Sequence, residues 1–170
     1  MVEGDARRYR MVDFGTVKAP ARERFAARLL KISVGVEALA ERFCPDVCAV
    51  EEAFFAVNPQ TALKLGHVRG VVLLAAERAG VEIAEYAPRL VKQTVVGYGA
   101  AEKQQVQEMI RVLLKLKEPP TPFDASDALA VAVTHLHHAS RPQQPKAGTT
   151  PARAKLEALL AANPRRRAPR

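Results

Sequence analysis

The pattern that most restricts the fold lies in residues 47–86, where a short apolar strand, a helix and a second strand follow one another. Residues 47–51 are apolar and end in an acid, and residues 81–86 have a similar strand-like composition. Between them, Asn58 can cap a helix that closes at Gly80. This order implies a parallel strand pair with a right-handed crossover, and therefore an α/β fold.

The remaining elements are expected on both sides of this unit. Apolar residues spaced three and four apart predict an amphipathic helix that stops near Pro45. The other expected elements follow from β-branched and aromatic composition, from apolar periodicity and from breaks at Pro and Gly. The full expectation is a strand over 9–18 and helices over 21–42, 59–79, 88–96, 102–116 and 124–140.

The net charge of +8 is typical of nucleic-acid-binding proteins, but it is concentrated at one end of the chain. Residues 141–170 contain eight Lys or Arg and one Glu, whereas residues 1–140 contain 18 basic and 17 acidic residues. We therefore expect one folded domain over 1–140 and a basic, largely disordered tail over 141–170 that can form a short helix. Any nucleic-acid site on the domain must come from local placement of charge.

Composition also bears on the compartment. No apolar run approaches the roughly 20 residues that a membrane span needs, and the first residues lack a signal-peptide pattern. The spacing of Cys44 and Cys48 lacks the second ligand pair of a zinc site. We interpret both as small buried hydrophobic residues in a reducing compartment, with no membrane partner, and expect a cytoplasmic location.

Asp124 and Asp127 begin the last apolar helix, and their spacing places both carboxylates on one helix face, about 5–6 Å apart. Two carboxylates this close repel each other unless a cation lies between them, and Mg²⁺ takes such oxygen ligands. The alternative is structural, because an acid at the N-cap with a second acid three residues later resembles a capping box. The segment alone leaves both interpretations open.

Glu51 stands at the carboxyl end of a strand, where sites gather in open α/β sheets. The adjacent Glu52 points to the opposite face, so that at most one of the two is a ligand. A solvated residue at a strand end is the alternative interpretation of Glu51. Together with the aspartate pair, it makes a candidate site for metal-dependent hydrolysis of phosphate esters.

Two lysines and two aromatic residues lie close to these acids in the sequence. Lys92 and Lys103 flank the helix break at residues 97–99, from which both could approach a phosphate, although lysines on helices are commonly just solvated. Phe54 and Phe55 point in different directions, which favours one exposed ring near the acids. Such a ring can stack on an unpaired base, an interaction of roughly 1–3 kcal/mol.

Gly66 and Gly70 lie inside the helix predicted over 59–79, where each costs about 1 kcal/mol relative to Ala. Paired glycines are tolerated where another backbone comes close. That backbone can belong to a second subunit or to the chain's own sheet, and both interpretations stay open. Three histidines near the end of the last helix are interpreted as a polar helix end: His135, His137 and His138.

Several segments, in this order, resemble the RuvC family of Holliday-junction resolvases, which have an RNase H-like fold. Residues 49–55 (AVEEAFF) match the segment with the family's second catalytic acid and its junction-probing aromatic ring. Residues 62–70 match its dimer helix, and residues 86–97 and 101–107 match its basic DNA-facing segments. Residues 124–135 match its terminal acid pair.

The resemblance covers about residues 2–139 and implies a homodimer that binds four-way DNA junctions. It implies symmetric nicking of two strands by hydrolysis with two Mg²⁺ ions per subunit, in recombination and repair. The RuvA and RuvB branch-migration proteins are the implied partners. The implied metal ligands are Glu51, Asp124 and Asp127, and the implied DNA contacts are Phe54, Lys92 and Lys103, of which Lys103 also counts as catalytic.

The resemblance fails at the start of the chain. The family opens with a strand that supplies a first catalytic Asp from the middle of the sheet, whereas residues 1–5 resemble the end of its second strand. The sequence around Asp13 resembles the Asp-bearing motif of the family's first strand. Its neighbours, however, match the family's third strand, so we do not expect Asp13 to be a ligand. Loss of a central strand leaves its neighbours about 9.6 Å apart, too far to pair. We expect an RNase H-like mixed sheet without its first strand, in a product that starts upstream of Met1.

Three hypotheses about function remain. The first is a Mg²⁺-dependent, junction-resolving endonuclease. The second is a catalytically impaired junction-binding dimer, because losing one of four acids impairs metal binding more than DNA contact. The third is another RNase H-like nuclease or a regulatory relative.

Overall fold

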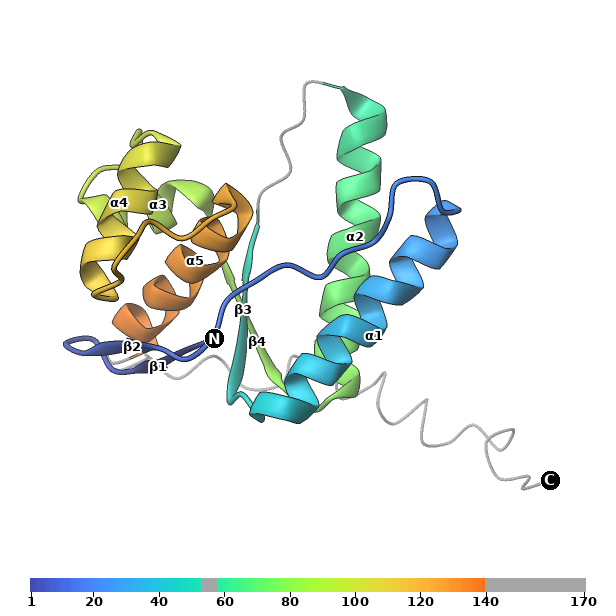
Figure 1. Ribbon diagram of the computed structural model, residues 1–170, viewed down its shortest axis with the longest axis horizontal. Helices are drawn as coiled ribbons and strands as arrows, with labels where there is room; N and C mark the ends of the chain where they lie inside the picture. The colour runs from blue at the N-terminus through green and yellow to red at the C-terminus, as the bar shows by residue number, and fades with distance from the viewer. Residues whose placement is uncertain (53–57, 140–170) are drawn as a thin grey trace, which may run out of the picture. The chain divides into compact units, whose positions relative to one another are not determined.

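The computed structural model describes residues 1–52 and 58–139, and Figure 1 shows its elements along the chain. The strands are β1 (Val2–Gly4), β2 (Tyr9–Met11), β3 (Val47–Glu51) and β4 (Glu82–Tyr86). The helices are α1 (Phe25–Phe43), α2 (Pro59–Arg78), α3 (Pro88–Val96), α4 (Lys103–Leu113) and α5 (Phe123–Ala139).

The parallel strand pair predicted from the sequence is confirmed. β3 and β4 run side by side in parallel, with Glu51 beside Tyr86 at their carboxyl ends. α2 lies between them in the chain and begins where the Asn58 side chain accepts a hydrogen bond from the Gln60 amide at 2.8 Å. This unit brings the carboxyl ends of both strands to one edge, where the candidate acid Glu51 stands.

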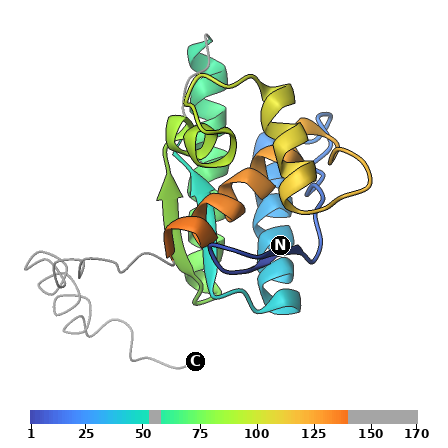
Figure 2. The same ribbon diagram turned by 90° about the vertical axis from the view of Figure 1, so that its left-hand side faces the viewer.

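Helices cover both sides of the β3–β4 pair (Figure 1). On one side, α1 and α2 pack against each other, and α2 also contacts β4. On the other side, α5 contacts β1, β3 and β4, and α3 and α4 pack on α5. Figure 2 looks onto this second helical layer. The result is the mixed α/β arrangement, flanked by helices, that the sequence predicts.

β1 and β2 form a separate antiparallel pair, with Val2 beside Met11 and Gly4 beside Tyr9. Both β1 and β3 pack against α5, yet within the described residues no ladder joins the two pairs into one sheet. This split agrees with the expected absence of a central strand, because strands that flank a missing neighbour stand too far apart to pair. Each pair therefore ends in an unpaired edge.

The strand expected over 9–18 is wrong in length, since only Tyr9–Met11 is a strand. The last backbone hydrogen bonds of the pair run from the Val12 and Asp13 amides to the Met1 carbonyl oxygen, at 3.0 and 3.5 Å. Beyond Asp13, no described residue of the β1 segment continues the backbone hydrogen bonds of the pair. Strand-like composition cannot make a strand without a neighbouring backbone to bond, so the following residues run outside any sheet.

The helices follow the sequence more closely. α3 has the predicted bounds, and Glu102 and Gln105 form a capping box at the start of α4. α1 begins at Phe25 instead of residue 21, because a turn precedes it in which the Glu23 amide bonds the Pro20 carbonyl oxygen at 3.1 Å. No helix within the described ranges is long and apolar enough to cross a membrane.

The hydrophobic core lies among α3, α4 and α5. Its fully buried members are Val91, Val95, Ala101, Val106, Ile110, Leu114, Leu129, Ala130, Val131 and Val133. By contrast, α1 contains no fully buried residue, although its apolar stripe has the predicted helical spacing. The α3–α5 layer is therefore the tightly packed half of the domain, and the α1–α2 layer keeps much of its apolar surface exposed.

The three histidines of α5 are not the simple polar helix end that the sequence suggested. Each is half-buried and meets a side chain from a different element. His135 Nδ1 lies 2.9 Å from the Tyr86 hydroxyl of β4, and His138 Nε2 lies 3.1 Å from the Thr94 hydroxyl of α3. His137 Nδ1 lies 3.3 Å from the hydroxyl of a β2 tyrosine. These contacts tie the end of α5 to three neighbours, which sequence spacing cannot reveal.

The two cysteines differ in their surroundings. Cys48 on β3 is half-buried, and burial raises the pKa of its thiol. Cys44 is exposed, so the prediction of a buried residue is wrong there. It ends α1 in a left-handed conformation with φ of 44°, which turns its side chain outward, and its thiol donates to the Glu41 carbonyl oxygen at 3.4 Å.

The core predicts a stability contrast within α4. Ile110 is 0% exposed, whereas Val112 is 54% exposed. We expect Ile110→Ala to lower the free energy of unfolding by about 2–5 kcal/mol, because it leaves a cavity in the α3–α5 layer. Val112→Ala should change it by less than about 0.5 kcal/mol. Urea unfolding of both variants measures the difference, and equal losses would contradict this location of the core.

Candidate active site

Glu51 is the last residue of β3 and is half-buried, whereas the next residue, Glu52, is exposed. The alternation of side chains along an extended backbone separates the two acids onto opposite faces. The Glu52 amide still bonds the Tyr86 carbonyl oxygen at 2.9 Å, which holds the end of β3 against β4. Only Glu51 is thus directed into the body of the domain from this strand end.

The two aspartates lie in the first two turns of α5. The helix begins at Phe123, so Asp124 is in the first turn and not at the N-cap that the capping interpretation required. The Ala125 amide bonds the carbonyl oxygen of Pro122 instead, at 3.0 Å. Asp124 is exposed and Asp127 is half-buried. Both negative charges favour the positive end of the helix, but neither is used as its cap.

Packing of α5 on β3 brings the acids of the two elements together. Burial is the largest cause that raises the pKa of Glu51 and the pKa of Asp127 above their ordinary values. The charge of Asp127 raises the pKa of Glu51 further, and the charge of Asp124 does the same to Asp127. Because such interactions fade over about 10 Å, the acids share one small region.

Both candidate lysines reach the same region. Lys103, the first residue of α4, and Lys92 of α3 each lower the pKa of Glu51 and the pKa of Asp127, in opposition to burial. In both cases the effect of Lys103 is larger than that of Lys92. The charges of the two lysines therefore act on the acids from two further helices, although Lys103 itself is exposed.

The acids are neighbours but do not form a closed metal-binding group. Within the described residues, no three carboxylate, imidazole or thiol side chains lie close enough to hold one ion. Mutual repulsion keeps carboxylates apart when no cation lies between them. Their chemistry still fits a hard divalent cation, because they are oxygen ligands. Burial raises their pKa values first and mutual repulsion adds to it, and such a cation would offset the repulsion.

Two other sequence candidates have different outcomes. Phe54 lies outside the described residues. Asp13 follows β2, and its carboxylate lies 3.8 Å from the Arg42 guanidinium of α1. This placement agrees with the expectation that Asp13 is not a ligand. Two residues that the sequence did not single out as site residues lie close in the chain to the candidate lysines. Arg89 is on α3 with Lys92, and Tyr98 is in the turn that leads to Lys103 at the start of α4.

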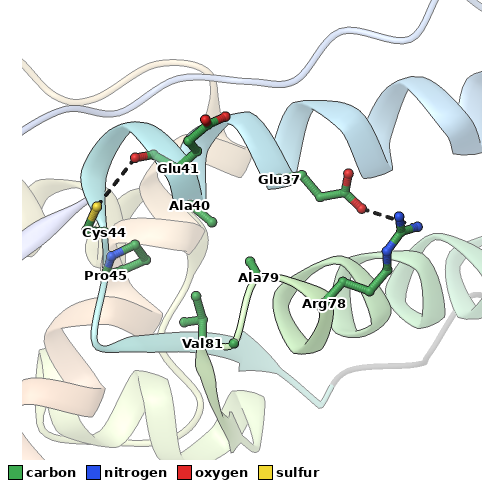
Figure 3. A pocket seen from close by; sticks show the side chains of 9 residues that line it. Glu37, Ala40, Glu41, Cys44, Pro45, Arg78, Ala79 and Val81 are labelled. Atoms are coloured by element: carbon green, nitrogen blue, oxygen red, sulfur yellow. Dashed lines mark hydrogen bonds and ion pairs between the residues drawn. The ribbon is translucent and has the colours of Figure 1, made fainter.

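A hollow at the opposite ends of the strands does not share this chemistry. It is lined by residues around the end of α1 and the α2–β4 turn, including Glu37, Cys44, Arg78 and Val81 (Figure 3). The Arg78 guanidinium pairs with the Glu37 carboxylate at 3.5 Å. The hollow lies near the start of β3, whereas Glu51 ends that strand, so we place the candidate active site at the acids.

Comparisons with known proteins agree with this arrangement. The family model described as crossover junction endodeoxyribonuclease RuvC matches residues 1–135. A RuvC from Heliobacterium modesticaldum is 50% identical over 137 residues, covering 81% of this chain and 85% of that protein. One from Azorhizobium caulinodans is 50% identical over 138 residues, covering 81% of each.

A solved structure is similar over the same region. Thermus thermophilus RuvC in complex with a Holliday junction substrate shares 39% identity and a TM-score of 0.77, covering 82% of this chain and 85% of that one. Together, the fold and the site define a hydrolytic nuclease with an RNase H-like fold. The chain belongs to the RuvC family of crossover junction endodeoxyribonucleases.

The raised pKa values predict that Asp127→Asn stabilises the domain without divalent cations. An acid whose pKa is higher in the folded state loses stability as the pH rises through that value, so the penalty is fully present at pH 7. The variant should therefore melt at a higher temperature than the parent at pH 7 in EDTA. The difference should shrink as the pH falls towards about 4.

Differential scanning calorimetry at several pH values measures this effect. Asp46→Asn, at an exposed aspartate just before β3, is the control and should show no comparable pH-dependent gain. A lower melting temperature for Asp127→Asn at pH 7 would mean that electrostatic attraction by the two lysines outweighs burial and repulsion.

Proposed function

We propose that the chain is a structure-selective endonuclease that binds four-way DNA junctions and nicks two strands symmetrically, in recombination and repair. The observation that carries this proposal is the meeting of acids from β3 and α5 with Lys92 and Lys103 from two other helices. Carboxylates suit metal-dependent hydrolysis, and the lysines suit the phosphate. The Holliday junction bound to the Thermus thermophilus relative supports the same substrate class here.

The proposed cofactor is Mg²⁺, two ions per subunit, with Glu51, Asp124 and Asp127 as the ligands from this chain. When bound, the ions activate a water and neutralise charge on the phosphate. Lys103 and Lys92 would hold the phosphate beside the acids. We assign Lys103 to the reacting phosphate because its charge acts more strongly on both buried acids, and Lys92 to the neighbouring backbone.

A second candidate function is a junction-binding dimer with impaired catalysis. The split between the β1–β2 and β3–β4 pairs favours it, because within the described residues no strand joins the two pairs to bring another acid beside Glu51. DNA contacts from lysines on α3 and α4 do not depend on that strand.

We also propose that two copies associate through α2. Leu63 and Leu74 of this helix are 65% and 57% exposed, and they border an apolar groove that also contains Gly66 and Gly70. A Cβ atom at either glycine would meet no other atom within 4 Å among the described residues. The chain's own sheet therefore does not require these glycines, which supports the alternative of close contact with a second copy.

The remaining proposals rest on family membership. RuvA and RuvB are proposed partners, and the cytoplasm is the proposed location. The basic segment 141–170 lies outside the described residues, and we propose that it adds salt-sensitive, non-specific DNA binding to the domain over 1–140.

The catalytic proposal can be tested with a labelled synthetic four-way junction. We expect the chain to bind this junction more tightly than linear duplex. Paired nicks in Mg²⁺ would support the endonuclease, whereas junction binding without nicks would support the impaired alternative. A version extended at its N-terminus by the family's Asp-bearing strand should make paired nicks. Asp127→Asn in the extended version should abolish nicking and leave junction binding nearly unchanged, because it alters a ligand and leaves the lysines in place. Asp46→Asn is the matched control.

Each part of this experiment can fail separately. Equal affinity for duplex and junction would reject the junction-selective function. Nicking by the chain without the added strand would reject the impaired alternative. Retained nicking by Asp127→Asn in the extended version would remove Asp127 from the metal site.

The dimer proposal predicts opposite effects on association and on stability. Leu63→Glu should shift the chain towards monomer in sedimentation velocity, because it places a charge in the apolar groove, whereas Val112→Glu on α4 should not. Gly66→Ala combined with Gly70→Ala should raise the helix stability of a monomer by about 1 kcal/mol per site and weaken the dimer. If the glycine variant gains stability and associates normally, α2 is not the interface.

A further inference from the structure

The turn between α3 and α4 presents an aromatic ring that the proposed chemistry does not use. Tyr98 is 46% exposed. Its hydroxyl donates to Gln105 Oε1 at 2.8 Å, and the same oxygen accepts the Glu102 amide at 2.8 Å. The ring is therefore tethered to the first turn of α4, and its orientation is fixed although much of its surface is in water.

The glycines on either side of Tyr98 shape this turn in two ways. Gly97 has φ of 99°, a left-handed conformation that ends α3 and that side chains disfavour. A Cβ at Gly99 would lie 2.4 Å from Arg89 Cγ and 3.1 Å from its Nε. Because Gly99 has no side chain, the aliphatic part of the Arg89 side chain can pack against the backbone of the turn, although Arg89 as a whole remains exposed. An arginine and an aromatic ring are held together on the surface.

This turn adjoins the start of α4, which links it to the candidate active site. Lys103 begins α4, and its charge acts on Glu51 and Asp127. The capping box already engages two of the amides at this helix end, those of Glu102 and Gln105, so we expect side chains to contribute most to binding an anion here. A fixed ring beside exposed cations is the combination that binds single-stranded or unpaired nucleotides, by stacking and by phosphate contact.

We propose that the turn at residues 97–99, with Arg89, is a further DNA contact that positions the strand entering the active site. Tyr98 stacks on an unpaired base, and Arg89 binds a phosphate of the same strand. The inference rests on the proposed junction-binding function. Both are positioning residues, because neither meets the acids.

Fluorescence of 2-aminopurine measures this contact directly. The base is placed at successive unpaired or flanking positions near the cut site of a synthetic junction, and the full chain is added in Ca²⁺. Wild type should quench one position. Tyr98→Ala should lose the quenching and bind the junction about 5- to 100-fold more weakly. Tyr98→Phe, which keeps the ring, should retain most of both. Phe14→Ala, at a ring that is 38% exposed on another segment, should match wild type.

Arg89 has its own readout. Arg89→Ala should lower the slope of log affinity against log salt by about one, because one phosphate contact is lost. Arg89→Lys should keep the slope. These measurements separate an ionic contact from a general loss of structure.

The outcomes test the Tyr98 and Arg89 contact separately from the proposed junction-binding function on which it rests. If wild type prefers the junction but Tyr98→Ala binds and quenches like wild type, the inference is overturned and the function stands. An unchanged salt slope for Arg89→Ala removes the arginine contact. If wild type shows no preference for the junction over duplex, the proposed function fails and this contact fails with it.

Discussion

The candidate active site depends on the packing of α5 against β3. Glu51 ends the strand and the two aspartates begin the helix, and this contact alone brings acids more than 70 positions apart into one electrostatic field. β4 holds the end of β3 in place, and the apolar face of α5 belongs to the core. The best-packed part of the domain is thus the part that positions the charges.

The charges themselves are unfavourable as they stand. Partial burial and mutual repulsion raise the pKa values of Glu51 and Asp127, and the two lysines offset this only in part. Such an arrangement costs stability unless a cation enters it. It is therefore better explained as a site that a ligand completes than as a structural salt-bridge network.

The two helical layers of the domain differ in packing and in the surfaces that they expose. The α3–α5 layer carries the core, both lysines and the tethered tyrosine, so its rigidity would serve the proposed contact with DNA. The α1–α2 layer keeps leucines exposed beside glycines that its own chain does not require. A second copy on that face would bury this surface and set the distance between two active sites, as paired nicks demand.

Local signals in the sequence determined the parallel pair, the capped start of α2 and the bounds of α3. These predictions succeeded because spacing, caps and helix breakers act over a few residues. The same signals singled out the candidate acids and lysines, whose roles stay predictions. Tertiary structure decided the rest. The strand expected after Tyr9 stops for lack of a backbone partner, and the histidines of α5 acquire partners from three elements. The sequence left the aspartates open to interpretation as a helix cap or a ligand pair. Only the packing of α5 on β3 brings the charge of Glu51 to bear on them, because the field of a charge depends on distance in space and not along the chain.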